Sequence, residues 1–283
     1  MIQGALGMLR IVTDSTAQLS REEIIANNIT VIPLQLEVDG KTGLDGKDIS
    51  RREFSESLAD STEIPRTSQP AIGQFLNVYN TLGKYNDPIL SIHITKTLSG
   101  TVETARMAAK QTRAQVTVLD SGFTDRALGF VLLKAVELGR NTDDVEKVVA
   151  ELKKIDKKIK LYCFINNIDY LVKNGRASRA TGFIASAIRL KLLVTLEEGN
   201  FKVKGKSHGQ KRFDLKVAKI VKNIIEDKSI KQVGLSYVDG EEAVFKIREE
   251  IKRRRPDISI FCNLTSPIIM AHVGHNGFAI IYV

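Results

Sequence analysis

Two short segments of the chain carry side chains suited to holding an anion. Thr67-Ser68-Gln69-Pro70 and Leu98-Ser99-Gly100-Thr101 lie 32 residues apart, counted from Thr67 to Ser99, and each comes just before a helical pattern. The start of a helix offers backbone N–H groups without intrahelical partners and the positive end of the helix dipole. Thr67 and Ser99 therefore predict two hydroxyls placed where a carboxylate or a similar head group binds.

Neither segment carries a general base, a metal-ligand set or a glycine-rich phosphate loop, so we expect no metal and no cofactor. Ser99 lacks the complete G-x-S-x-G elbow of hydrolases, although Leu98-Ser99-Gly100 matches half of it. His272 and His275 are placed in a glycine-containing loop. A Ser99–His272 dyad stays open, beside a ligand-contacting or a purely structural His272. Metal-ligand spacing is absent from the four histidines, His93, His208, His272 and His275.

Strand and helix patterns alternate through the first half of the chain, which favours a mostly parallel sheet with helices on both faces. Ser20 and Glu23 have the spacing of a capping box at the start of the first helix. Strands are predicted at 9–12, 30–38, 88–94 and 116–119, and helices from residue 20 and over 48–58, 70–79, 99–111 and 124–138.

Polar residues follow three of these strands, at Asp14-Ser15-Thr16, at Thr97–Ser99 and at Asp120-Ser121. The carboxyl ends of strands in an open parallel sheet are where ligands bind. The same residues are also suited to capping the helices that follow. Taken singly, each of these residues favours helix capping, and their position on one edge of the sheet strengthens the case for a ligand site only modestly.

The second half predicts an α+β arrangement. A hairpin over 191–205 turns at Glu198-Gly199-Asn200, and an apolar helix over 181–190 is either ordinary core or the lining of a lipid tunnel, with Arg176 near its mouth. The other predicted strands are 161–165, 232–237, 258–262 and 278–283, and the other predicted helices are 167–173, 212–226 and 241–254.

The length of 283 residues favours two domains, which we place at 8–157 and 158–283 with the seam in the charged stretch 153–160. Residues 1–150 carry 16 basic and 19 acidic side chains (net −3), and residues 151–283 carry 26 and 14 (net +12). Such asymmetry indicates an anionic partner or a solvated basic surface. The basic run 252–255 lies at the C-terminal end of a predicted helix, where positive charge complements the negative end of the helix dipole. We expect no nucleic-acid partner, because the chain has no helix-turn-helix, zinc finger or aromatic RNA platform.

Cellular location is predicted from two features. Cys163 and Cys262 lie in apolar strand-like runs, and two buried free thiols fit a reducing cytoplasm. No apolar run approaches the 18 residues of a membrane span, and residues 1–8 lack the pattern of a secretory signal. We therefore expect a cytoplasmic protein without a membrane span, and a transient contact with a membrane surface stays open.

Taken together, these segments resemble the DegV family of bacterial fatty-acid-binding proteins over roughly residues 10–282. The order and spacing of the motifs along the whole length make the match strong. They are Ile11-Val12-Thr13-Asp14-Ser15-Thr16-Ala17, Thr67-Ser68-Gln69-Pro70, Leu98-Ser99-Gly100-Thr101, Asp120-Ser121, the Tyr170-Leu171-X-X-X-Gly175-Arg176 loop and Ala271-His272-X-Gly274.

The resemblance implies a non-catalytic protein that encloses one long-chain fatty acid, such as palmitate, between two domains. It implies that the carboxylate meets Thr67 and Ser99, with His272 and Arg176 in supporting roles. Some members of the family carry the acyl group to a separate ATP-dependent fatty acid kinase subunit. The alternatives are an enzyme, either a Ser/His acyl hydrolase or a small-molecule kinase subunit, and a nucleic-acid interaction module.

This chain departs from the family pattern at two places. After the histidine the family usually has Gly-Pro-Gly, where this chain has Gly274-His275-Asn276. After the hairpin the family commonly has an arginine-bearing stretch that is thought to engage the kinase subunit, and here His208 and Gln210 occupy it.

Overall fold

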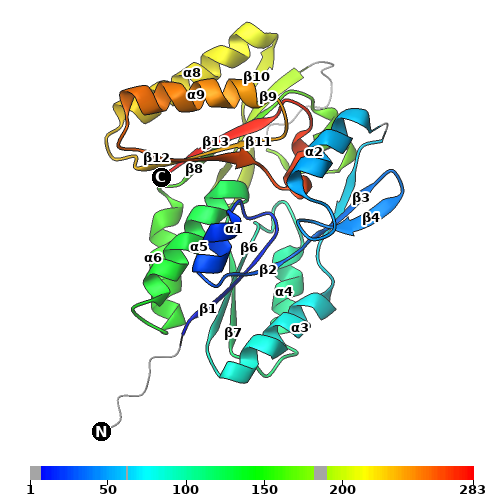
Figure 1. Ribbon diagram of the computed structural model, residues 1–283, viewed down its shortest axis with the longest axis vertical. Helices are drawn as coiled ribbons and strands as arrows, with labels where there is room; N and C mark the ends of the chain where they lie inside the picture. Colours follow the sequence, from blue (N-terminus) through cyan, green and yellow to red (C-terminus); the bar gives the residue numbers. More distant parts are fainter. Residues whose placement is uncertain (1–7, 62, 182–189) are drawn as a thin grey trace.

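The computed structural model describes residues 8–61, 63–181 and 190–283, whose strands form three sheets (Figure 1). A four-stranded sheet in the first half and a six-stranded sheet in the second half are the two main layers. The predicted mixed α/β class, with a parallel sheet followed by an α+β part, is confirmed. The predicted helix over 181–190 falls almost wholly outside the described residues. No helix among those described combines the length and apolarity needed to cross a bilayer.

The four-stranded sheet is parallel, with strand order β2-β1-β6-β7. In Figure 1, α3 and α4 lie on one side of it and α5 and α6 on the other. The predicted capping box is present, because Ser20 Oγ accepts from the Glu23 amide and Glu23 accepts from the Ser20 amide. The elements are β1 (Arg10–Asp14), α1 (Arg21–Ala26), β2 (Thr30–Ile32), α3 (Ile72–Leu82), η1 (Gly83–Tyr85), β6 (Ile89–His93), α4 (Thr101–Ala109), β7 (Val116–Asp120), α5 (Asp125–Gly139) and α6 (Val145–Asp156).

The prediction of one strand over 30–38 is wrong, because the chain changes sheets at Pro33. Strand β2 lies at the edge of its sheet and ends at Ile32, directly before Pro33, which has no N–H to donate to a further sheet hydrogen bond. A small antiparallel sheet of order β4-β3-β5 follows, and it places Thr67 opposite Leu36. Its elements are β3 (Gln35–Val38), β4 (Lys41–Leu44), α2 (Arg51–Asp60) and β5 (Arg66–Ser68).

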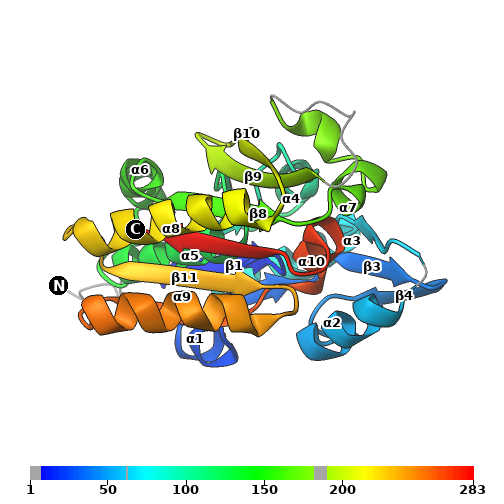
Figure 2. The same ribbon diagram turned by 90° about the horizontal axis from the view of Figure 1, so that it is seen from above.

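The six-stranded sheet has the order β10-β9-β8-β13-β11-β12 and is antiparallel except for the β11–β12 pair. Figures 1 and 2 show α8 and α9 on its outer face, away from the four-stranded sheet. The elements are β8 (Lys160–Ile165), α7 (Asp169–Lys173), η2 (Ala177–Arg179), β9 (Leu190–Glu197), β10 (Asn200–His208), α8 (Gln210–Glu226), β11 (Gln232–Tyr237), α9 (Glu241–Arg254), β12 (Ser259–Leu264), α10 (Pro267–Val273) and β13 (Phe278–Tyr282).

Two helices, α6 and α10, were not predicted, although the sequence contains signals for both. In α6 the residues Val145, Val148, Val149 and Leu152 follow the i, i+3, i+4, i+7 pattern of an amphipathic helix, and the charged residues among them obscure it. Helix α10 begins with Ser266 as N-cap and Pro267 in its first turn, a standard helix start.

The four basic residues at the end of α9 have two different roles. Lys252, Arg253 and Arg254 lie in the last helical turn, as predicted. Arg255 is instead buried, at 2% exposure, and it donates to Asp257 and to the carbonyl oxygens of Ile224, Asp227 and Ile230. Arg255 thus connects the end of α9 to the end of α8 and the segment after it. It does not belong to the solvated basic surface.

Helix α5 packs between the two main sheets, and its Arg126 side chain is buried there. The Arg126 guanidinium lies 2.7 Å from Glu23 and 3.9 Å from the centre of the Phe261 ring. Gly234 of β11 makes room for it, because a Cβ there would lie 2.4 Å from Arg126 Cγ. One buried cation therefore joins α1 and α5 to the six-stranded sheet.

Arg126→Met tests this connection. We expect the free energy of unfolding to fall by about 3 kcal/mol, because the change leaves Glu23 partly buried without its partner. The control Arg106→Met breaks an exposed pair with Glu103 and should leave stability nearly unchanged. Urea unfolding of both variants measures the difference, and equal effects would show that Arg126 does not join the sheets.

Candidate functional site

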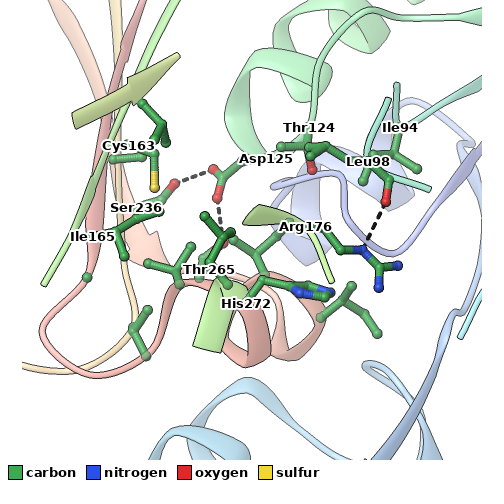
Figure 3. Close-up of a pocket in the computed structure, with 18 of the residues that line it drawn as sticks. Ile94, Leu98, Thr124, Asp125, Cys163, Ile165, Arg176, Ser236, Thr265 and His272 are labelled. Carbon is green, nitrogen blue, oxygen red and sulfur yellow. Dashed lines mark hydrogen bonds between the residues drawn. The ribbon is translucent and has the colours of Figure 1, made fainter. Parts of the chain in front are cut away.

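An apolar pocket lies between the inner face of the six-stranded sheet and elements of the first half (Figure 3). Its empty space is about 930 Å³ when the open mouth is included. A mostly apolar lining with a few polar side chains is the usual form of a small-molecule site. Thr67, Ser99, Arg176 and His272 all line it. Its apolar wall includes Leu34, Ile94, Leu161, Val194, Leu196 and Phe201.

The two hydroxyl-bearing segments meet through Gln69. The end of the Gln69 side chain lies against Gly100 at the start of α4, where a Cβ would be 2.0 Å from Gln69 Oε1. Gln69 then donates to Thr104 Oγ1 at 2.7 Å. Ser99 precedes α4 as predicted and pairs with Thr101 Oγ1 at 2.9 Å. The expected position of Thr67 at a helix start is wrong, because Thr67 lies in β5 and α3 begins only at Ile72.

His272 lies in the last turn of α10, and the predicted loop position for it is wrong. The helix ends at Gly274, whose φ of +73° suits glycine and whose missing side chain leaves room for the Tyr170 ring. His272 Nε2 lies 2.9 Å from Thr67 Oγ1. This hydrogen bond joins the small three-stranded sheet to the second half of the chain at the wall of the pocket.

The residues that replace the usual Pro-Gly have contacts of their own. His275 Nδ1 lies 2.7 Å from Asp239 Oδ2, and its Nε2 lies 2.9 Å from the Leu58 carbonyl oxygen. The Asn276 amide donates to the other oxygen of Asp239. Side-chain hydrogen bonds thus hold the turn after α10 against α2, in place of the stiffness that proline supplies.

His272 is neutral at physiological pH. Burial lowers its pKa to about 3, and the charges of Arg176 and Arg179 act in the same direction. Its Nδ1 is buried and has no hydrogen-bond partner among the described residues. His272 therefore contributes one hydrogen bond, to Thr67, and no charge to the pocket.

Two arginines bring positive charge near His272, although only Arg176 lines the pocket, and neither pairs with a carboxylate among the described residues. Arg176 donates to the carbonyl oxygens of Leu98 (3.2 Å) and Asn174 (2.7 Å), and Figure 3 shows the bond to Leu98. Arg179 donates to the Thr97 carbonyl oxygen. Asn174 in turn donates to the Ala271 carbonyl oxygen of α10. Arg176 thus connects the Ser99 turn with the His272 helix while its charge remains available to an anion.

The three polar strand ends do not form one site. The turn after β6 lines the pocket through Leu98 and Ser99, whereas Asp14 and Asp120 are not among its lining residues. Asp120 accepts from the amides of Lys96 and Gly122, a local turn contact.

Asp14 instead belongs to a fully buried chain of side chains. Asp14 Oδ2 lies 3.0 Å from His93 Nδ1, His93 Nε2 lies 2.7 Å from Ser91 Oγ, and Ser91 contacts the Tyr79 hydroxyl. All four residues are 0% exposed, so this Asp-His-Ser arrangement satisfies core polar groups, away from the pocket.

The hydrogen bonds of Ser99 and His272 do not join these residues as a dyad: Ser99 Oγ pairs with Thr101, and His272 Nε2 pairs with Thr67. Cys163 and Cys262 are free and half-buried, and Cys163 lines the pocket. Burial raises the pKa of the Cys163 thiol, which keeps it protonated and a poor nucleophile.

The fold and the pocket define an α/β protein with an apolar ligand cavity between two sheets. The sequence profile of the DegV family matches residues 8–283, and this chain belongs to that family. A DegV domain-containing protein of Listeria monocytogenes is 36% identical over 277 residues, covering 97% of this chain and 98% of the relative. A DegV domain-containing protein of Staphylococcus aureus is 34% identical over 271 residues, covering 96% of this chain and 97% of the relative.

Two solved structures share the fold closely. DegV of Bacillus subtilis, described as a fatty acid binding protein, superposes with a TM-score of 0.90 at 27% identity, covering 98% of this chain and 99% of that one. A DegV family protein of Thermus thermophilus, for which fatty acid binding is described, superposes with a TM-score of 0.85 at 26% identity. The match covers 97% of this chain and 99% of that one.

The neutral state of His272 predicts a pH effect. Between pH 6.5 and about 3 the unfolded chain binds a proton at His272 that the folded protein does not, so acidification destabilises the fold. Relative to His272→Gln, the wild type should lose roughly 2 kcal/mol between pH 7.5 and pH 5. The variant is the necessary reference, because burial raises the pKa of Asp45 to about 7, which has the opposite sign. Urea unfolding at both pH values measures this difference, and parallel pH curves would contradict a buried neutral His272.

Proposed function

We propose that this protein binds one long-chain fatty acid and carries it without chemical change. The observation that carries the proposal is an apolar pocket lined by the Thr67 and Ser99 hydroxyls and by Arg176, which has no carboxylate partner among the described residues. Its fold is shared with fatty acid binding DegV proteins of two bacteria. We also propose the division into domains 8–157 and 158–283, with the ligand between them.

The acyl chain supplies the affinity in this proposal. A sixteen-carbon chain buries about 14 methylenes at ~0.8 kcal/mol each, or roughly 11 kcal/mol before costs. Lost translational and rotational freedom and the ordering of the chain offset a large part of that gain. The polar residues then determine orientation, because a carboxylate buried without donors is unfavourable by several kcal/mol.

Thr67 and Ser99 are proposed to donate to the carboxylate, with His272 as the residue that orients Thr67. If His272 Nε2 carries the proton and donates to Thr67 Oγ1, the Thr67 hydroxyl keeps its own proton for the ligand. We assign this tautomer to the bound state. Arg176 supports the carboxylate through its charge and through its hydrogen bond to the residue before Ser99.

Thr67→Ala combined with Ser99→Ala tests the head-group role. We expect the amount of fatty acid that co-purifies to fall about tenfold or more, because the two changes remove about two charge-assisted hydrogen bonds while the apolar wall remains. Native mass spectrometry measures the occupancy, and far-UV circular dichroism checks the fold.

Thr117→Ala is the matched control, because Thr117 is exposed on β7 and is not among the residues lining the pocket. It should leave occupancy at the wild-type level. Wild-type occupancy and head-group position in the double variant would contradict the assignment of Thr67 and Ser99.

The second part of the proposal is presentation of the bound carboxylate to an ATP-dependent kinase subunit in the cytoplasm. Its support is the family resemblance together with the bound position proposed for the carboxylate. His208 and Gln210, which stand where family arginines are expected, lie exposed at the end of β10 and the start of α8. Gln210 is held by Lys191 and Asp214.

Trapping with hydroxylamine tests this second part. An acyl phosphate formed from the bound fatty acid reacts to an acyl hydroxamate, which mass spectrometry detects. We expect hydroxamate when loaded protein, ATP and an extract of the source cells are combined, and none from loaded protein with ATP alone. Formation with ATP alone would make the chain itself a kinase, and no formation with extract would exclude the partnership.

A further inference from the structure

Thr124 is a pocket residue whose hydroxyl the head-group assignment does not use. Seven described hydroxyl side chains line the pocket, and six of them have hydrogen-bond partners within the protein. Thr67 pairs with His272, Ser68 with Gln35, Ser99 with Thr101, Ser236 and Thr265 with Asp125, and Tyr237 with Glu241. Thr124 Oγ1 alone has none among the described residues.

The usual reason for a threonine at this position is absent. Thr124 is the N-cap residue of α5, where a hydroxyl normally accepts a hydrogen bond from an amide of the first turn. Here the side chain makes no capping bond. The residue is only 7% exposed, so bulk water does not satisfy its hydroxyl either. A buried hydroxyl without a partner is unfavourable, and valine has nearly the same shape without that cost.

The surroundings of Thr124 restrict what its partner is. Figure 3 draws the Thr124 oxygen pointing away from α5, toward the side chains of the pocket. The neighbouring Asp125 also lines the pocket and accepts from the hydroxyls of Ser236 and Thr265, so its oxygens are already engaged. A carboxylate next to Thr124 disfavours a second anion there. The matching group is therefore an uncharged oxygen on the ligand.

We propose that Thr124 forms a second polar contact of the pocket, which pairs with a hydroxyl carried along the acyl chain. The ligand class is then hydroxylated long-chain fatty acids, bound through the carboxylate at one place and through the chain hydroxyl at Thr124. This inference rests on the proposed function, because it needs an acyl chain in the pocket. Thr124 then distinguishes hydroxylated chains from plain hydrocarbon chains, because a plain chain leaves the Thr124 hydroxyl without a partner.

Competition binding tests the proposal with stearate and a series of monohydroxystearates that differ in the position of the hydroxyl. The ratio of the stearate Kd to the hydroxystearate Kd is measured for the wild type and for Thr124→Val. We expect this ratio to fall about tenfold in the variant for at least one position of the hydroxyl, the effect of one hydrogen bond. Thr124→Ser keeps the hydroxyl and should retain the wild-type ratio.

Thr13→Val is the matched control, because Thr13 Oγ1 is also buried without a partner among the described residues but does not line the pocket. It should leave every ratio unchanged. An unchanged ratio in Thr124→Val for all hydroxystearates, with stearate still bound, would overturn this inference alone. Equal weakening of stearate and hydroxystearates would assign Thr124 to the carboxylate and also overturn it. Failure of stearate to bind the wild type would overturn the proposed function and this inference with it.

Discussion

The hydrogen bond between Thr67 and His272 is the contact on which the polar end of the pocket depends. It crosses 205 residues of sequence and joins a three-residue strand to the last turn of a short helix. Both elements are too short to be stable alone, so each is held by its neighbours. Arg176 and Asn174 reinforce the junction, because they connect the Ser99 turn to the same helix.

The buried polar residues of the core and the polar residues of the pocket have different roles. In the core, the Asp14-His93-Ser91-Tyr79 chain has its hydrogen bonds filled from within and is closed to ligands. At the pocket, neutral His272 and Arg176, which pairs with no acidic side chain in the described part of the chain, leave hydrogen-bonding capacity and positive charge for an incoming carboxylate. An apolar pocket with such an end suits a ligand with one anionic head and a long hydrocarbon chain.

The sequence predicted the alternating elements of the first half and the hairpin of the second, because periodicity and turn residues are local signals. It did not predict the break at Pro33 or the helix at Pro267, although the proline in each case gave a local signal. It named Thr67, Ser99, Arg176 and His272 as site residues, and all four line one pocket. The connecting role of Gln69 and the unsatisfied hydroxyl of Thr124 were not predictable, because both depend on contacts between distant segments.

The most direct test of the account is a crystal structure of the protein with palmitate bound. The account predicts one palmitate between the two sheets, with its carboxylate oxygens within hydrogen-bond distance of Thr67 Oγ1 and Ser99 Oγ. It also predicts that the Thr67–His272 bond is kept. A carboxylate bound away from both hydroxyls, or a pocket filled by side chains with no acyl chain inside, would contradict it.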